Sequence, residues 1–474
     1  MRQSLLLASG AIALMLAALG CTSLPVARGV SDDLAPGAAV EEVETLPAPR
    51  PSNAEPMPSR PAELPEEVDE GPADGMTLGE AIERLLQANI DLSAKFQDIP
   101  KARADVLSAG LRNDPVVFLS AAPIPYGRFS TQRPGATAYD ITVVQSLDVS
   151  GKHKSNTLVA QKMIPILECR YQDAARLKVD AFCTVYVNVL EARAAVRAAR
   201  ANLERLAETV ERTRRLVRQG QRPPADVTRA SLRHANARLA LRRMEAALRQ
   251  ARRDFATLLA IPAEEADCLR VRGPLRDCFP PPPCTEELIR IALQTRPDLA
   301  AHRLSVVRAQ AQVRRARAEG MEDLFLFFSP FQLNDMSPQN KSNTLAWQIG
   351  ILLPIPIFDR NQGEIAHARA DVAQWRMEVD RAEQEVIDEV RRAATEYAVS
   401  REAVQRYERE MLAQARGLRE EKYHLFASGQ KDLGSFLATQ RSYDDIVREY
   451  LEALARHRRD MLRLNTVVGQ RILP

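Results

Sequence analysis

Histidine spacing in this chain is unfavourable for a metal site. The chain has 474 residues and 6 His, and no two histidines stand four residues apart, as a metal-binding helix face requires. A glycine-rich phosphate loop, a nucleophile elbow and a paired metal motif are also missing from the sequence. We therefore expect no catalytic residue, no bound metal and no cofactor. The histidines are His153, His234, His302, His367, His424 and His457.

Five of the six cysteines lie in the body of the chain. Cys169 and Cys183 fall on one helical stretch about four turns apart, which is too far for a disulfide between them. Cys268, Cys278 and Cys284 share one Pro-rich loop, where one disulfide is compatible with an oxidising compartment. Zinc is the alternative ligand for these three thiols, but no histidine lies nearby.

The sixth cysteine follows an export signal. Arg2 supplies a positive charge, Leu5–Leu19 is an uncharged apolar run, and small residues precede Cys21. A run this short is typical of a signal peptide, here residues 1–20, rather than of a membrane span. The position of Cys21 resembles a bacterial lipobox, which would make Cys21 the acylated first residue of the mature protein. Ordinary signal cleavage beside a coincidental cysteine is the alternative.

Composition narrows the class of protein further. Residues 21–75 carry the lipidated Cys and a Pro- and Glu-rich stretch that cannot bury a core, so we expect an extended tether. The formal net charge is +3 with 27% charged residues, and no basic face or nucleic-acid motif is present, so we expect no nucleic-acid partner. Beyond the signal, no stretch is long and apolar enough for a transmembrane helix, so a chain of this kind could span a membrane only with strands.

The first half of the body has the order helix, two strands, two long helices. A helix begins with Thr77 as N-cap and Glu80 three residues later, and it ends before Asn113-Asp114-Pro115. Residues 139–148 alternate between apolar and polar types, which predicts a strand, and residues 116–124 are its expected partner.

Two long helices follow these strands. Residues 166–219 contain no Gly or Pro, which corresponds to roughly 80 Å of helix, and residues 227–261 form a second such stretch. Pro165 should kink the first helix or set its boundary. Apolar residues recur in alternating steps of 3 and 4, as in a coiled coil, at Leu203, Leu206, Val210, Thr213 and Val217.

The second half repeats this order. We expect a first repeat at 76–262, an inter-repeat loop at 263–284, a second repeat at 285–469 and a tail at 470–474. In the second repeat we predict a helix at 285–320, strands at 324–333 and 345–353, and long helices at 364–416 and 435–468.

Four strands cannot close a barrel, and they cannot stand in lipid with open edges. Closure therefore requires several chains. Three copies would give twelve strands, an even number within the range of outer-membrane barrels.

The sequence resembles the TolC family of outer-membrane efflux proteins from about Thr77 to Gly469. Ala109–Pro115 and Gln145–Lys152 resemble the family's passages from helix to strand and from strand to helix. Leu293–Leu299 resembles a second copy of its opening helix. Pro354–Ile365, with the sequence Pro-Ile-Pro-Ile-Phe-Asp-Arg-Asn-Gln-Gly-Glu-Ile, is the most specific run and is most similar to the heavy-metal branch of the cobalt-zinc-cadmium type.

The resemblance implies a mainly α homotrimer with a small β part: a 12-stranded β-barrel in the outer membrane, continued by a long α-helical barrel in the periplasm. It implies a passive duct, not an enzyme. Its partners would be a periplasmic membrane-fusion adaptor, an inner-membrane pump of the RND type and outer-membrane lipid. Heavy-metal cations are the expected cargo, and drugs or small organic molecules are the alternative. A lipid-anchored periplasmic coiled-coil adaptor or structural protein, without a channel, is the competing class.

The two helical hairpin tips match each other and would form the periplasmic mouth. Gly220 and Gly429 should end the incoming helices, and Asp226 and Ser435 should cap the outgoing ones. The resemblance implies that Lys431 pairs with Asp226 to help hold the mouth shut, although Lys is a weaker partner than Arg. The further mouth residues are Arg222 and Asp432. The family's pore-facing pair of aspartates maps to Ser435 and Ala438, neither of which is acidic, and Asp432 and Asp444 are only loose substitutes.

Overall fold

A computed structural model describes residues 71–122, 137–276, 281–335, 341–427 and 431–473. The described chain is mainly helical with one small antiparallel sheet, as expected. The predicted signal, Cys21, the tether up to residue 70, Cys278 and Gly429 lie outside the described residues. None of the described helices combines the length and the apolar character of a membrane span. Apart from the gaps, the described residues divide into two compact units, 100–165 with 304–376, and 71–99 with 166–303 and 377–473.

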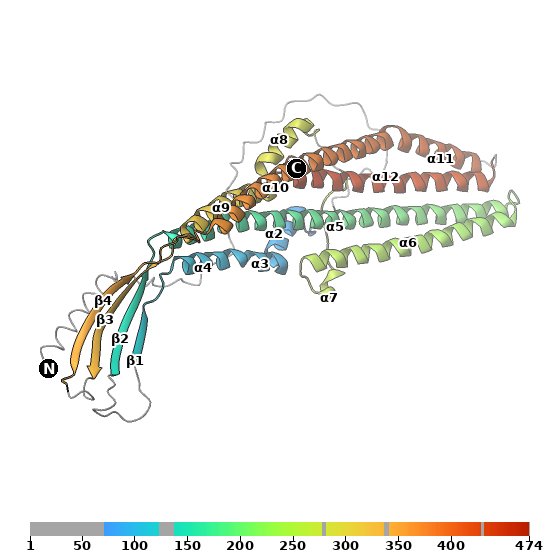
Figure 1. The fold of residues 1–474 in the computed structure, drawn as a ribbon. Coiled ribbons are helices and arrows are strands. Elements are labelled where there is room, and N and C mark those ends of the chain that lie inside the picture. Colours follow the sequence, from blue (N-terminus) through green and yellow to red (C-terminus); the bar gives the residue numbers. More distant parts are fainter. Residues whose placement is uncertain (1–70, 123–136, 277–280, 336–340, 428–430, 474) are drawn as a thin grey trace, which may run out of the picture. The chain divides into compact units, whose positions relative to one another are not determined.

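The order of elements repeats once along the chain (Figure 1). The first series is α2 (Leu78–Ala88), α3 (Ile90–Phe96), α4 (Asp98–Gly110), β1 (Val116–Ala122), β2 (Thr137–Leu147), α5 (Lys152–Arg218) and α6 (Pro224–Leu258), followed by the short α7 (Ala263–Ala266). The second is α8 (Thr285–Thr295), α9 (Pro297–Glu319), β3 (Leu324–Asp335), β4 (Thr344–Leu352), α10 (Gln362–Arg406), η2 (Tyr407–Met411), α11 (Leu412–Ala427) and α12 (Leu433–Val468).

The start of the first helix is confirmed, but its length is not. The side chain of Thr77 accepts from the Glu80 amide (3.4 Å) and the Glu80 carboxylate accepts from the Thr77 amide (2.9 Å). One helix from 77 to 112 was wrong, because three helices fill this stretch. One helix at 285–320 was wrong as well, because α8 ends at Thr295 and α9 begins at Pro297, with extended backbone at Arg296 between them. Asn89 ends α2 with extended backbone and caps α3 by accepting from the Leu92 amide at 3.1 Å.

The helix α5 begins earlier than the absence of Gly and Pro predicted. The Asp148 carboxylate accepts from the backbone amides of Gly151, Lys152 and His153 at 2.7, 3.1 and 2.9 Å, which satisfies the first turn and fixes the helix start. Pro165 therefore lies inside α5 and does not set its boundary.

The sheet has the order β1-β2-β3-β4 and is antiparallel throughout (Figure 1). Paired residues share a face, and the pairing places apolar side chains on one face and most of the polar ones on the other. The apolar face carries Val117, Leu119, Ile141, Val143, Phe328, Phe331, Leu345, Ile349 and Ile351. The opposite face is mixed. It carries most of the polar side chains, Asp140, Thr142, Ser329, Gln332 and Gln348, beside the apolar Phe118, Val144, Phe325 and Phe327, and the Thr142 and Ser329 hydroxyls lie 2.5 Å apart.

The larger unit has a continuous core of helix-borne residues. Phe182 and Tyr186 of α5 and Phe255 of α6 are almost fully buried, and the rings of Phe182 and Phe255 lie 5.2 Å apart. The hydroxyl of Tyr186 donates to the carbonyl of Arg272 at 2.5 Å, which fastens the inter-repeat segment to α5.

A π-helical turn, η2, separates α10 from α11. Two consecutive residues of this turn contact the same neighbouring helix, α12. Tyr407 donates to the Glu449 carboxylate at 3.2 Å, and Tyr450 donates to the Glu408 carboxylate at 2.8 Å. Glu408 also forms an ion pair with Arg276 at 2.7 Å.

Candidate functional site

The tips of the two long helix pairs, α5 with α6 and α11 with α12, meet within one unit (Figure 1). Gly220 has a φ of +71° at the end of α5, the left-handed conformation that ends helices, so this part of the prediction is confirmed. Gly429 lies in the stretch 428–430 that the structure does not describe.

The predicted N-caps of the outgoing helices were wrong. Helix α6 has Pro223 as its N-cap without a side-chain hydrogen bond, and Asp226 lies three residues later inside the first turn. In α12 the cap is Asp432, whose carboxylate accepts from the Ser435 amide at 3.2 Å. Pro224, the first residue of α6, has no N–H that needs a partner and a fixed φ that suits a helix start. The Asp226 amide donates to the Pro223 carbonyl at 3.1 Å, so two of the first positions make no demand on a side-chain cap.

An aromatic cluster fills the space between the two tips. Phe426 of α11 is fully buried, and its ring stacks on Phe436 of α12 with centroids 5.5 Å apart and planes 9° apart. Tyr423 packs against Phe436 at 5.5 Å. Ala230 and Ala237 of α6 belong to the same buried cluster, so the first tip supplies small residues where the second supplies rings.

Arginines of the first helix pair lie over rings of the second. Arg222 lies 5.5 Å from the centre of the Phe426 ring and donates to the carbonyl of Lys431. Arg212 lies 5.6 Å from the centre of the Tyr423 ring. Cation–π contacts of this kind stabilise by roughly 0.5–1 kcal/mol at exposed sites. Arg222, which the sequence analysis predicted to lie at the periplasmic mouth, therefore joins the two hairpin tips within one chain.

The expected pair of Asp226 and Lys431 is not formed within this chain. Asp226 is only 5% exposed, and its ion-pair partner is Arg229 at 3.8 Å on the next turn of α6. Lys431 is exposed, and its backbone amide donates to the Leu425 carbonyl at 3.1 Å. Asp226 and Lys431 could therefore contact each other only if they belong to different copies of the chain.

Asp444 of α12 lies deeper in the same unit, beside α5. Its carboxylate lies 3.7 Å from the Arg205 guanidinium and accepts from the Gln440 amide group at 3.0 Å. Burial raises the pKa of Asp444 to about 6, and the nearby Arg205 and Arg419 only partly oppose this effect. The charge of the Asp444 side chain therefore changes near pH 6.

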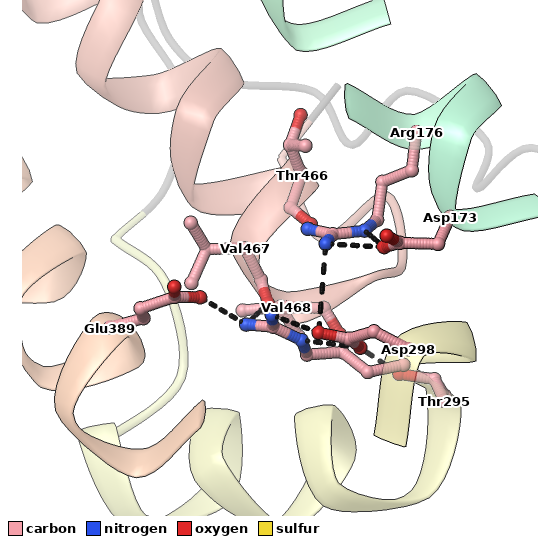
Figure 2. A network of polar contacts seen from close by, with 9 residues as sticks. Asp173, Arg176, Thr295, Asp298, Glu389, Thr466, Val467 and Val468 are labelled. Carbon is pink, nitrogen blue, oxygen red and sulfur yellow. Dashed lines mark hydrogen bonds and ion pairs between the residues drawn. The ribbon is translucent and has the colours of Figure 1, made fainter. Parts of the chain in front are cut away.

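A second polar site fixes the C-terminal end of α12 (Figure 2). Three successive carbonyls of this helix accept side-chain hydrogen bonds: Arg176 donates to Thr466 at 2.9 Å, Arg296 to Val467 at 3.3 Å, and Thr295 to Val468 at 2.9 Å. These are carbonyls that a helix end leaves without partners, and two of the donors carry the positive charge that this end favours.

Arg296 is the centre of this network, with a side chain only 4% exposed. It donates through two nitrogens to Asp298 at 3.1 and 2.5 Å, and to Glu389 of α10 at 2.5 Å. Burial opposes its charge, but the hydrogen bonds that Arg296 donates to the two carboxylates outweigh burial and raise its pKa above the usual arginine value. We name this set, Arg296 with Asp298, Glu389 and the Val467 carbonyl, the Arg296 clamp.

The four thiols in the described residues, Cys169, Cys183, Cys268 and Cys284, are free. Two of the three loop cysteines are thus unbridged, and the third, Cys278, lies outside the described residues. Burial raises the pKa of the Cys183 thiol to about 12, which makes it unreactive. Among the described residues, no group of three or more His, Cys, Asp or Glu side chains could hold a metal ion.

The sequence predicted where the two hairpin tips lie, but it did not predict most of the side-chain contacts between them. Arg212, Tyr423, Phe426 and Phe436 were not singled out, although two Phe and one Tyr around one hairpin turn are an available signal in a chain with only 5% aromatic residues. Arg296 was identified only as part of a resembling run.

Comparison with known proteins places the chain in a family. The family model described as outer membrane efflux protein matches residues 81–260 and 288–470. Cobalt-zinc-cadmium resistance protein CzcC of Cupriavidus metallidurans is 26% identical over 307 residues, which are 64% of this chain and 68% of that protein.

Solved structures share the fold at low sequence identity. The structure of CusC has a TM-score of 0.66 at 18% identity and covers 88% of this chain and 99% of that one. The outer membrane protein VceC of Vibrio cholerae has a TM-score of 0.66 at 16% identity, with 83% and 96% covered. Since the family model spans both series of elements, the chain belongs to the outer membrane efflux protein family.

Proposed function

We propose that the chain is the outer-membrane exit duct of a tripartite efflux system, and that heavy-metal cations are its cargo. The observation that carries the duct is the four-stranded sheet, which has one apolar face and an opposite face that holds most of its polar side chains. Trp347 and Ile351 of β4 are 69% and 64% exposed, and Leu119 of β1 is 70% exposed. Such a face suits lipid, and the polar face suits an aqueous lumen.

Assembly follows from the sheet edges. Within the described residues, β1 and β4 each pair on one side only. An open edge cannot stand in lipid, because its N–H and C=O groups would lack partners. Edge pairing between three copies would close a barrel of twelve strands. Mass measurement of the purified protein in detergent should give three copies, and a well-behaved monomer or dimer would refute this assembly.

The metal cargo rests on the similarity to the cobalt-zinc-cadmium resistance protein and on the Pro354–Ile365 run. Deleting the gene in a strain that keeps its pump and adaptor should raise cellular cobalt, zinc or cadmium in the presence of the metal, and the wild-type gene should restore export. Accumulation of a fluorescent drug, with unchanged metal content, would assign the duct to small organic molecules instead. If neither cargo accumulates, a non-channel role as a periplasmic coiled-coil protein becomes the better account.

The anchor is part of the proposal. Acylation of Cys21 would hold the chain to the outer membrane in addition to the strands, since one acyl chain alone binds only marginally. Labelled fatty acid should be incorporated into the wild-type chain and not into Cys21→Ser. If wild-type protein takes up no label, ordinary signal cleavage is the correct reading of this N-terminus.

A further inference from the structure

A groove lies between the end of the inter-repeat segment and α10, inside one of the two units. Its volume is about 540 Å³, within the range of roughly 300–1,000 Å³ that is usual for pockets holding drug-sized ligands. Apolar residues of both segments line it, namely Pro281–Pro283, Leu288 of α8, and Ala394 and Ala398 one turn apart on α10. Such a groove offers an apolar surface, and its few polar groups decide what it can bind.

Tyr397 of α10 is a buried hydrogen-bond donor in the lining of this groove. The residue is only 3% exposed, and its ring lies 5.0 Å from the ring of His457 on α12, which fixes its orientation. Within the part of the chain that the structure describes, the Tyr397 hydroxyl has no hydrogen-bond partner. A buried hydroxyl without a partner is unfavourable, and a molecule in the groove can supply the acceptor.

Arg401 brings a positive charge to the same place. It lies one turn after Tyr397, it is half-buried, and it has no ion-pair partner among the described residues. Its neighbour Glu402 also lines the groove, but this carboxylate pairs with Arg406 at 3.0 Å. Burial raises the pKa of Tyr397 and the nearby Arg401 only partly opposes this, so the hydroxyl remains a neutral donor beside a cation.

The first turn of α8 borders the groove through Cys284 and Thr285. Cys284 caps this helix without a side-chain hydrogen bond, and the first amides of a helix favour an anion. Glu286 and Glu287 already place negative charge in this turn. The local charge therefore suits a ligand with one negative charge better than a ligand with two.

We propose that this groove binds a carboxylate carried on an apolar body of about tripeptide size. Arg401 and Tyr397 would donate to the carboxylate, and Pro281–Pro283 and Leu288 would pack against the apolar part. A small anion would leave the proline surface uncovered, and an uncharged apolar molecule would leave the two donors without a charged acceptor. All these groups belong to one chain, so the proposal depends neither on the trimer nor on the exported cargo.

The thiol of Cys284 reports whether the groove is occupied, because this exposed and free cysteine is part of the lining. The full-length protein in detergent is pulsed with N-ethylmaleimide, and peptide mapping by mass spectrometry gives the labelling rate of each thiol. The peptide acetyl-Ala-Pro-Leu, which ends in a carboxylate, should slow labelling of Cys284 about fivefold or more at saturation, because it covers the thiol. Cys268 is a free, exposed thiol outside the groove and should keep its rate in the same experiment.

Two further probes separate charge from apolar contact. The C-terminal amide of the same peptide lacks only the charge, and about tenfold more of it should be needed for half-protection, because charged hydrogen bonds are the stronger ones. Inorganic phosphate has the charge without the apolar body and should not protect Cys284 at the concentrations where the peptide does. No protection by the peptide, or equal protection by the amide or by phosphate, would overturn the proposal.

Substitutions assign the two donors. Half-protection should need about tenfold more peptide in Arg401→Gln and about three- to tenfold more in Tyr397→Phe, because the first loses a charged donor and the second a neutral one. The ring in Tyr397→Phe can still pack against His457, so this variant should keep the wild-type fold. Arg391→Gln changes an exposed arginine of α10 outside the groove and is the matched control, with wild-type affinity expected. Wild-type affinity in Arg401→Gln or in Tyr397→Phe would refute the assigned site.

Discussion

Removing the Arg296 guanidinium should loosen the end of α12. In Arg296→Met, Asp298 keeps a weak contact with Arg176 at 3.9 Å and Glu389 is 48% exposed, so water can replace part of what is lost. Two losses are not compensated. One is the pair of hydrogen bonds to the half-buried Asp298 carboxylate, and the other is the hydrogen bond to the Val467 carbonyl. Breaking a fully buried pair costs about 3–5 kcal/mol, so we expect about 2–4 kcal/mol here.

Hydrogen–deuterium exchange of peptides covering residues 464–473 measures this cost where it arises. Because about 1.4 kcal/mol corresponds to a factor of ten, protection should fall by roughly 30-fold to several hundred-fold. Arg296→Lys keeps the charge but cannot reach all three acceptors, so it should lose an intermediate amount. Glu389→Gln should cost less than about 1 kcal/mol of stability, because Glu389 is 48% exposed and solvent screens its ion pair with Arg296. Wild-type protection in Arg296→Met would mean that packing alone holds this helix end.

Three further predictions concern the tip and its surroundings. The pKa of Asp444 is raised on folding from 3.8 to about 6, so its contribution to stability is complete below pH 4 and lost as pH rises through 6. Asp444→Asn should therefore flatten the change in thermal midpoint between pH 4.5 and 8 and stabilise the protein at pH 8 by up to about 3 kcal/mol, and an unchanged pH slope would contradict this. Phe436→Ala should cost about 3–4 kcal/mol and raise hydrogen exchange in α11 and α12 near the tip, whereas exchange equal to wild type would show that the stacked rings are not needed. Lys431 is exposed at the tip, so Lys431→Glu, which reverses the charge of this position in every copy, should raise single-channel conductance in planar bilayers, and unchanged conductance would indicate that the aromatic cluster holds the mouth.

The sequence predicts elements better than contacts in this protein. Apolar residues recur every two residues in a strand and every three to four in a helix, and this pattern depends only on which neighbours along the chain share a face. The four strands were therefore found within a few residues. The long helices were found with less exact ends, since α5 begins at 152 and not 166, and the helix predicted at 364–416 continues through η2 and α11 to 427. The caps at Pro223 and Asp432 were missed, because several polar residues near each turn could serve and only the backbone path selects one.

Contacts between segments far apart in the chain could not be predicted from the sequence. Arg222 and Phe426 are about 200 residues apart, and their contact depends on how two helix pairs are aligned. Asp226 was selected as a mouth residue by its place in the turn, but whether a side chain points outward or into its own helix pair is decided by packing. The Arg296 clamp could not be predicted for the same reason, since Glu389 of α10 and the Val467 carbonyl of α12 become its acceptors only when these helices pack beside Arg296.

The π-turn at η2 has a consequence for insertions and deletions. A π-turn holds one residue more than an α-turn, so the side chains beyond it are rotated relative to an uninterrupted helix. Consecutive residues of an α-helix do not face one neighbour, yet Tyr407 and Glu408 both reach α12. Removing a single residue between 407 and 411 could restore a regular helix at the expense of one of these contacts, without moving the hairpin tip by a full turn. This stretch is therefore a place where homologous chains can differ in length by one residue and keep the same fold.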